Sequence, residues 1–213
     1  MRASTRRAPP ALVPELAVRT AGEVVPLWHA VERFLGREGT EPPFWAWPWP
    51  GSQVIARTLL DDPGLARGRR VLDFASGGGL AAVAAARCGA RVTACELDPL
   101  AIAALRVNAG DAGVEVRAVL GDLTGAVPAD IDLVIAGDTC YERAPAARIV
   151  AWLHACAAAG LEVWLADPGR AWAPTAGVDW FGTWDVPTSV DLENVAVRRT
   201  RLGRVVGPVT APV

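Results

Sequence analysis

Short hydrophobic runs alternate with helical patterns along most of this 213-residue chain. Five apolar runs bounded by turn residues predict buried strands at residues 70–74, 91–95, 114–119, 131–136 and 161–166. The helical patterns between them predict crossover connections, and therefore a parallel sheet with helices on both faces. Two further strand-like runs, at residues 180–186 and 195–201, predict a closing hairpin. The predicted fold class is α/β, with a doubly wound seven-stranded sheet that is mostly parallel and ends in a C-terminal antiparallel hairpin.

The first sixty residues follow a different pattern. Residues 25–36 carry apolar side chains, including Phe34, near one face of a predicted helix that Gly36 ends. The segment 41–51 holds three tryptophans and four prolines, which predicts a stiff aromatic loop before a helix restarts at Gln53. The predicted organisation is a flexible tail at 1–20, a helical and Trp/Pro-rich cap at 21–60, the main domain at 61–206 and a tail at 207–213.

Composition narrows the class of protein. Hydrophobic residues make up 52% of the chain and charged residues 21%, which is typical of a packed globule. The net charge of -2 gives no global basic field, so we expect no nucleic-acid partner. No apolar run approaches the ~20 residues that span a bilayer, and no secretory signal is evident, so a cytoplasmic protein is expected. No long exposed apolar stripe stands out, so a monomer is expected. The four cysteines form no CxxC pair, and no metal site is expected.

A glycine-rich loop follows the first predicted strand and carries the sharpest local signal. The run from Val71 to Gly79 holds three consecutive glycines, which let a backbone approach a ligand closely. Gly77 and Gly79 fit the dinucleotide fingerprint, which leaves a NAD enzyme open. Asp73 is expected to point into the loop, where a carboxylate repels a pyrophosphate but suits an amino group or a sulfonium. This argument favours S-adenosylmethionine as the cofactor.

Two more carboxylates follow strands at the same predicted edge of the sheet. Glu96 ends the second strand, where it can accept both hydroxyls of a ribose. Asp122 follows the third strand, and two roles stay open for it: a hydrogen bond to the adenine amine, or a turn aspartate. Asp98, before Pro99, is expected to cap a helix.

The fourth strand ends in Gly137-Asp138-Thr139-Cys140-Tyr141, an acid-x-x-aromatic motif at the edge where a substrate meets a cofactor. With the glycine-rich loop, this motif resembles the seven-β-strand, Rossmann-like protein lysine methyltransferases. Three stretches are similar to the electron-transfer flavoprotein β-subunit lysine methyltransferase family, whose bacterial relatives are often labelled nicotinamide N-methyltransferase-like. They are residues 43–46 together with 49–51, residues 71–73 and residues 166–170. The resemblance covers residues 40–205.

The resemblance implies a fold, a cofactor and several roles. It implies that Trp49 shapes the cofactor pocket, that Gly137 borders the cofactor and that Asp138 engages the target amine. Tyr141 is expected to wall the channel as the second catalytic residue. Ala75 replaces the family's first loop glycine, so the loop is expected to keep an ordinary φ at this cofactor-binding position.

The function expected from this resemblance is that of an S-adenosylmethionine-dependent N-methyltransferase acting on protein lysine. The electron-transfer flavoprotein β-subunit is one candidate substrate. Two alternatives stay open: a methyltransferase for a small, nicotinamide-like amine, and a non-catalytic protein that binds the cofactor or acts as a scaffold for partners. The role of Asp167-Pro168-Gly169-Arg170, a turn or part of the substrate mouth, stays open as well.

Overall fold

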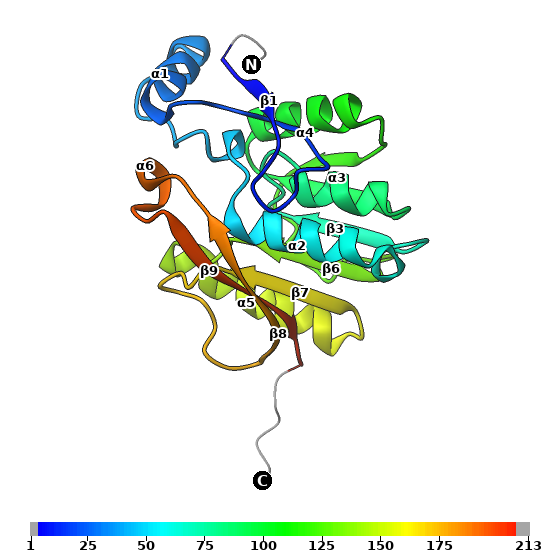
Figure 1. Ribbon diagram of the computed structural model, residues 1–213. Coiled ribbons are helices and arrows are strands. Elements are labelled where there is room, and N and C mark those ends of the chain that lie inside the picture. Colours follow the sequence, from blue (N-terminus) through cyan, green and yellow to red (C-terminus); the bar gives the residue numbers. More distant parts are fainter. Residues whose placement is uncertain (1–3, 208–213) are drawn as a thin grey trace.

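The computed structural model describes residues 4–207 and contains the predicted sheet. Seven strands lie in the order β5-β4-β3-β6-β7-β9-β8. Each neighbouring pair from β5 to β7 is parallel, whereas β9 is antiparallel to both β7 and β8. The mostly parallel sheet with a terminal antiparallel hairpin is therefore confirmed (Figure 1).

The strands of the sheet are β3 (Arg70–Phe74), β4 (Arg91–Glu96), β5 (Arg117–Leu120), β6 (Leu133–Gly137), β7 (Glu162–Asp167), β8 (Val178–Pro187) and β9 (Val197–Val205). The helices are α1 (Val24–Leu35), α2 (Pro50–Asp61), α3 (Leu80–Arg87), α4 (Pro99–Ala112), α5 (Arg143–Ala158) and the short α6 (Val190–Glu193), with 3-10 turns η1 (Phe44–Ala46) and η2 (Pro63–Leu65). Within residues 4–207, no helix combines the length and the apolar character that crossing a membrane requires.

The two faces of the sheet are covered by different helices because successive strand residues point to opposite sides. Val71, Ile135 and Trp164 pack with α2 and α3 on one face. Leu72 and Val134 pack with α5 on the other face. Apolar side chains on both sides explain why the parallel strands read as continuous hydrophobic runs rather than alternating ones.

The N-terminal segment differs from the predicted flexible tail. Strands β1 (Arg6–Ala8) and β2 (Val18–Thr20) pair antiparallel, and the turn between them lies against the helical layer (Figure 1). Val13 is fully buried and Leu16 is 3% exposed, in a cluster with residues of α2, α3 and α4. Val18 is buried in the same cluster, and the Arg19 N–H donates to the Asn108 side chain at 2.8 Å. The sequence did not reveal these anchors, because the few apolar residues of this proline-rich segment form no periodic pattern.

Two N-terminal predictions about helices need correction. Helix α1 ends before Gly36 as expected, but it buries Leu27 and Val31, while Phe34 is 77% exposed. The predicted aromatic loop is shorter than expected, because α2 begins at Pro50 rather than at Gln53. A proline is tolerated at the first helical position, where its missing N–H has no intrahelical partner.

Candidate functional site

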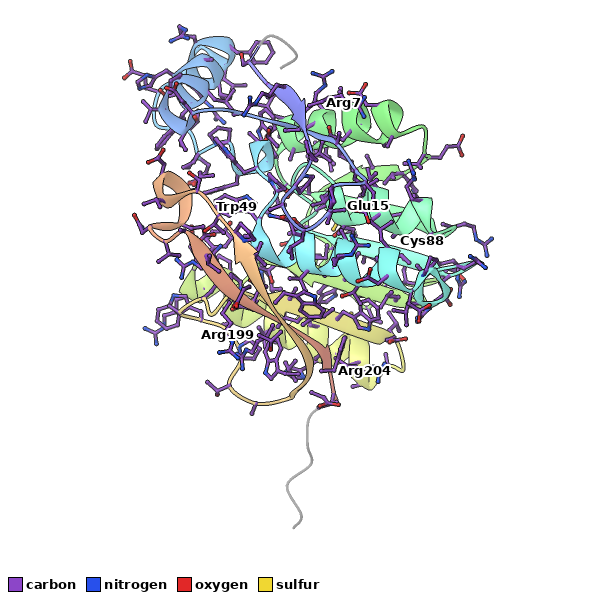
Figure 2. All side chains as sticks on the ribbon, in the orientation of Figure 1. Arg7, Glu15, Trp49, Cys88, Arg199 and Arg204 are labelled. Atoms are coloured by element: carbon purple, nitrogen blue, oxygen red, sulfur yellow. The ribbon has the colours of Figure 1, made fainter. Side chains whose placement is uncertain are left out.

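One large cavity lies at the carboxyl ends of the parallel strands. Its volume is about 740 Å³, within the range of small-molecule sites. The loops after β3, β4, β5, β6 and β7 all contribute to its lining, as do η1 and the start of α2. Figure 2 shows Trp49, one of the lining residues, beside the start of α2. This is the edge at which open α/β sheets bind their ligands.

The glycine-rich loop forms the floor of the cavity by close backbone packing. The Gly79 N–H donates to the Ser76 carbonyl at 2.8 Å, and the Ser76 N–H donates to the Cys95 carbonyl at 3.1 Å. A Cβ at Gly78 would lie 2.6 Å from the Trp45 carbonyl oxygen, so only glycine fits there. The aromatic segment of η1 is therefore packed directly on the loop, which ties two distant predicted features into one site.

Ala75 contradicts the expectation of an ordinary backbone angle. Its φ is +53°, in the left-handed region that favours glycine, and its side chain is exposed at the cavity. The loop therefore keeps the geometry that a glycine would give it and accepts a strained alanine.

The structure places two of the expected cofactor residues away from the cavity lining. Asp73 is 3% exposed, and its carboxylate accepts the Ala82 N–H at 2.9 Å, in the first turn of α3. Burial raises the pKa of Asp73 to about 8, so the expected repulsion of a pyrophosphate by a charged Asp73 does not hold. Gly79 is buried at the N-cap of α3, where a Cβ would meet Leu105. Both residues shape the loop rather than face the cavity.

Glu96 does line the cavity. One of its carboxylate oxygens accepts the Gly77 N–H at 2.9 Å and the other accepts the Leu97 N–H at 2.8 Å. Burial raises its pKa, while these backbone hydrogen bonds oppose the rise. Each oxygen keeps a second lone pair, so the carboxylate is held rigidly and can still accept hydroxyl groups.

Asp122 has the contacts of a turn aspartate and also lines the cavity. Its carboxylate accepts the backbone N–H and the hydroxyl of Thr124 at 2.9 and 2.7 Å. Its second oxygen lies 3.0 Å from the Arg148 guanidinium. The Thr124 hydrogen bonds, with a smaller contribution from Arg148, hold the pKa of Asp122 below its usual value.

Asp138 is the buried carboxylate of the cavity. The backbone of Asp138 has a φ of +57°, and its side chain is only 10% exposed. One oxygen accepts the Gly51 N–H at 2.6 Å, from the first turn of α2. Burial raises its pKa to about 7, although the Arg170 charge and the Gly51 hydrogen bond lower it. A carboxylate with a pKa near neutrality can accept and release a proton at working pH.

Glycines at 51 and 137 allow helix α2 to approach the strand end that carries Asp138. A Cβ at Gly51 would lie 2.5 Å from the Asp138 carboxylate, and one at Gly137 would lie 2.9 Å from the Ser52 nitrogen. Gly137 lines the cavity. Gly51 does not line it but donates its N–H to Asp138, a role that the sequence analysis did not single out.

Three aromatic rings stand in the same cavity. The Phe44 and Tyr141 ring centroids are 5.8 Å apart, and those of Phe44 and Trp49 are 6.0 Å apart. The Trp49 indole N–H donates to the Phe44 carbonyl at 2.7 Å, which fixes the ring. Phe44 was not predicted as a site residue, because only folding of the 3-10 turn brings it beside Tyr141.

Arg170 lies in the segment whose role the sequence left open between a turn and the substrate mouth. Asp167 accepts the N–H groups of Gly169 and Arg170, both at 2.7 Å, and Gly169 has a φ of +81°. This geometry suits a turn with proline and glycine at its centre. The turn sends the Arg170 side chain into the cavity, 3.3 Å from Asp138 and 5.8 Å from the centre of the Trp49 ring. The segment is therefore both a turn and part of the cavity.

Several known proteins are similar to this chain in sequence or in fold. Residues 71–160 match a family model described as a methyltransferase domain. A solved magnesium protoporphyrin IX methyltransferase from Synechocystis, which contains bound S-adenosylmethionine, matches the structure with a TM-score of 0.55 and 18% identity, covering 72% of this chain and 78% of that chain.

Two curated relatives share more sequence with this chain. The zebrafish electron transfer flavoprotein beta subunit lysine methyltransferase is 34% identical over 75% of this chain and 62% of its own length. The rat protein of the same name is 37% identical over 60% of this chain and 51% of its own length. The chain thus spans about half to three-fifths of these relatives.

Proposed function

We propose that the protein is an S-adenosylmethionine-dependent N-methyltransferase that acts on a lysine side chain of a protein. One observation carries the proposal: a buried carboxylate, Asp138, faces the same cavity as the glycine-rich loop, Glu96 and three aromatic rings. The similarity to lysine methyltransferases from zebrafish and rat supports the same activity. Their names also make the β-subunit of an electron transfer flavoprotein the first acceptor to test.

The cavity suits S-adenosylmethionine on several independent grounds. Glu96 would hold the ribose hydroxyls with its unused lone pairs, and Asp122 would lie near the adenine. Ala75 and Gly77 would border the amino-acid end of the cofactor, and Trp49 would wall its reactive side. The bound cofactor would supply an electrophilic methyl group.

The reaction asks little covalent chemistry of the protein. An amine must be neutral to attack, although the free pKa of lysine is about 10.4. The rings of Phe44, Trp49 and Tyr141 would exclude water and disfavour the ammonium form. Asp138 would accept a hydrogen bond from the amine, orient its lone pair and stabilise the positive charge that develops on nitrogen.

The charges at the mouth of the cavity favour a cationic acceptor. Glu41 and Glu142 line the cavity, and their charges, after the larger effect of burial, raise the pKa of Tyr141. Both carboxylates therefore lie near the Tyr141 ring, which lines the same cavity as Asp138. This combination suits the approach of a lysine side chain from a protein surface, because exposed carboxylates attract cations and aromatic faces bind them.

The cofactor assignment is tested by calorimetric titration of the purified chain with S-adenosylmethionine, S-adenosylhomocysteine and NAD. We expect the two sulfur ligands to bind and NAD not to bind. Binding of NAD alone would show a dinucleotide enzyme, and binding of no ligand would favour the scaffold hypothesis.

The acceptor is tested by mass spectrometry of a purified flavoprotein β-subunit and of nicotinamide after incubation with enzyme and cofactor. The chain itself contains no lysine, so self-methylation at lysine adds no background.

Asp138→Asn tests the assigned role of the carboxylate. The amide keeps the size of the side chain but loses its charge, so we expect turnover to fall by about 10²-fold or more while calorimetry shows cofactor affinity little changed. Asp185→Asn, on the exposed side of β8, is the matched control and should keep full turnover. Full turnover in Asp138→Asn would remove Asp138 from the mechanism.

A further inference from the structure

Arg170 lies between two carboxylates at the side of the cavity. One of its terminal nitrogens is 3.3 Å from an oxygen of Asp138 and 2.5 Å from an oxygen of Glu193, and the other is 2.9 Å from the second Glu193 oxygen. The guanidinium is 18% exposed, and Glu193 is 2% exposed. Paired hydrogen bonds of this kind fix both the position and the plane of a guanidinium.

Glu193 is itself held from a second side. Arg198, at the start of β9, donates from Nε to the Glu193 carboxylate at 2.8 Å and from a terminal nitrogen to the Glu193 carbonyl at 2.8 Å. Glu193 belongs to α6, the short helix between β8 and β9. A buried carboxylate is costly unless it is paired, so two arginines on one buried glutamate mark a built network rather than a surface ion pair.

We infer that Arg170 is a positioning residue that keeps Asp138 ionised and aimed at the acceptor amine, and that Glu193 fixes Arg170 in the orientation this requires. The inference rests on the proposed function for the identity of the amine. The coupling between Arg170 and Asp138 is a property of the chain itself and can be measured without any substrate.

The charges around Asp138 explain why an arginine is needed there. Burial is the main cause that raises the pKa of Asp138, and the charge of Asp167 raises it further, whereas Arg170 and the Gly51 N–H lower it. Burial raises the pKa of the neighbouring Cys140 thiol to about 11, so it stays neutral and adds no further negative charge. Loss of Arg170 would therefore shift Asp138 toward its protonated form. A protonated carboxyl could no longer stabilise positive charge on the amine.

The first experiment measures the ionisation of Asp138 by carbon-13 NMR of its carboxyl group in the labelled chain, assigned by its absence in Asp138→Asn. We expect Arg170→Gln to raise the pKa of Asp138, so that its acid ionisation constant falls by at least about tenfold. Arg170→Lys keeps the positive charge and should lie closer to the wild type. An unchanged pKa in Arg170→Gln, in a chain that is still folded by circular dichroism, would overturn the inference.

Two further variants separate this role from general loss of structure. In Arg170→Gln alone, the buried Glu193 carboxylate loses one of its partners. The double variant Arg170→Gln/Glu193→Gln removes that carboxylate as well, and it should still raise the pKa of Asp138. Arg204→Gln is the matched control, because Arg204 also pairs with a carboxylate, Glu162, at 2.9 Å. Figure 2 shows Arg204 toward the far end of the sheet from Trp49, so this variant should leave the pKa of Asp138 unchanged.

The second experiment follows turnover against pH. The active form needs Asp138 ionised, so the rate falls as pH drops through the pKa of Asp138. Arg170→Gln should move that acidic limb to higher pH and lower kcat at pH 7 more than it changes cofactor affinity, with recovery at alkaline pH and partial rescue by Arg170→Lys. An equal loss at every pH would assign Arg170 a structural role only. Failure of the chain to bind S-adenosylmethionine would instead overturn the proposed function and leave the NMR result intact.

Discussion

Ala75 shows how a single residue in the glycine-rich loop is held against its own preference. An L-residue in the left-handed region costs roughly 1–2 kcal/mol, and Ala75 has a φ of +53°. The hydrogen bonds of Ser76 and Gly79 on either side of the turn fix the backbone there. The loop conformation is therefore imposed by its neighbours and not by the residue.

Ala75→Gly should relieve this strain. The gain is offset by the larger conformational entropy of glycine in the unfolded chain, about 0.4–1 kcal/mol, so we expect a net stabilisation of up to about 1 kcal/mol. The measurement is urea unfolding at fixed pH. Ala86→Gly in α3 is the control and should destabilise by roughly 0.5–1 kcal/mol, because its helical backbone suits alanine. A destabilised Ala75→Gly would show that the loop is not strained.

At the scale of elements, short segments far apart in sequence complete the main domain. The β1–β2 segment covers α2, α3 and α4, and η1 packs on the glycine-rich loop. Helix α2 supplies the Gly51 N–H to Asp138. None of these contacts follows from the local pattern of the segments, because each depends on a few apolar or small residues that meet their partners only in the folded chain.

Leu16→Ala tests whether the N-terminal segment belongs to the folded unit. Leu16 is 3% exposed, and truncation of a buried leucine costs about 2–5 kcal/mol. We therefore expect Leu16→Ala to lower the free energy of unfolding by about 2 kcal/mol or more, measured by urea unfolding. Phe34→Ala removes a larger side chain that is 77% exposed, and it should change stability by less than about 0.5 kcal/mol. Equal small effects of the two substitutions would restore the flexible-tail interpretation.

At the scale of the whole molecule, two sets of acidic side chains have pKa values shifted in opposite directions: buried acids upward, and more exposed acids that pair with arginines downward. Burial raises the pKa of Asp73 to about 8 and that of Asp138 to about 7. Hydrogen bonds from Arg70 and Arg57 hold the pKa values of Asp132 and Glu15 below their usual values. The two sets of groups change stability in opposite directions as pH changes.

The pH dependence of stability follows from these signs. The acids whose pKa is raised in the folded protein contribute stability that is complete below about pH 4 and is lost as pH rises through about 7 to 8. The acids whose pKa is lowered contribute stability that is lost below about pH 4. We therefore expect the free energy of unfolding to be highest near pH 4–5 and to fall toward pH 8, as measured by urea unfolding. Asp73→Asn should flatten this fall by up to about 1.4 kcal/mol per pH unit. Parallel curves for the wild type and Asp73→Asn would contradict the assignment.

The hydrophobic pattern alone determined the order of strands and helices, the mostly parallel sheet and the edge at which Glu96, Asp122, Gly137 and Asp138 gather. It could do so because buried parallel strands need continuous apolar runs, and because all their carboxyl ends meet at one edge. Such residues are found by their place after a strand.

Only the tertiary structure decided which neighbours complete the site. It turned Asp73 inward to the first turn of α3, forced Ala75 into the left-handed region and brought Phe44 beside Tyr141. It also joined Arg170 to Glu193, although a strand and a hairpin turn separate them in the sequence. These contacts depend on packing between segments with no periodic signal of their own, and burial rather than residue type sets their charges.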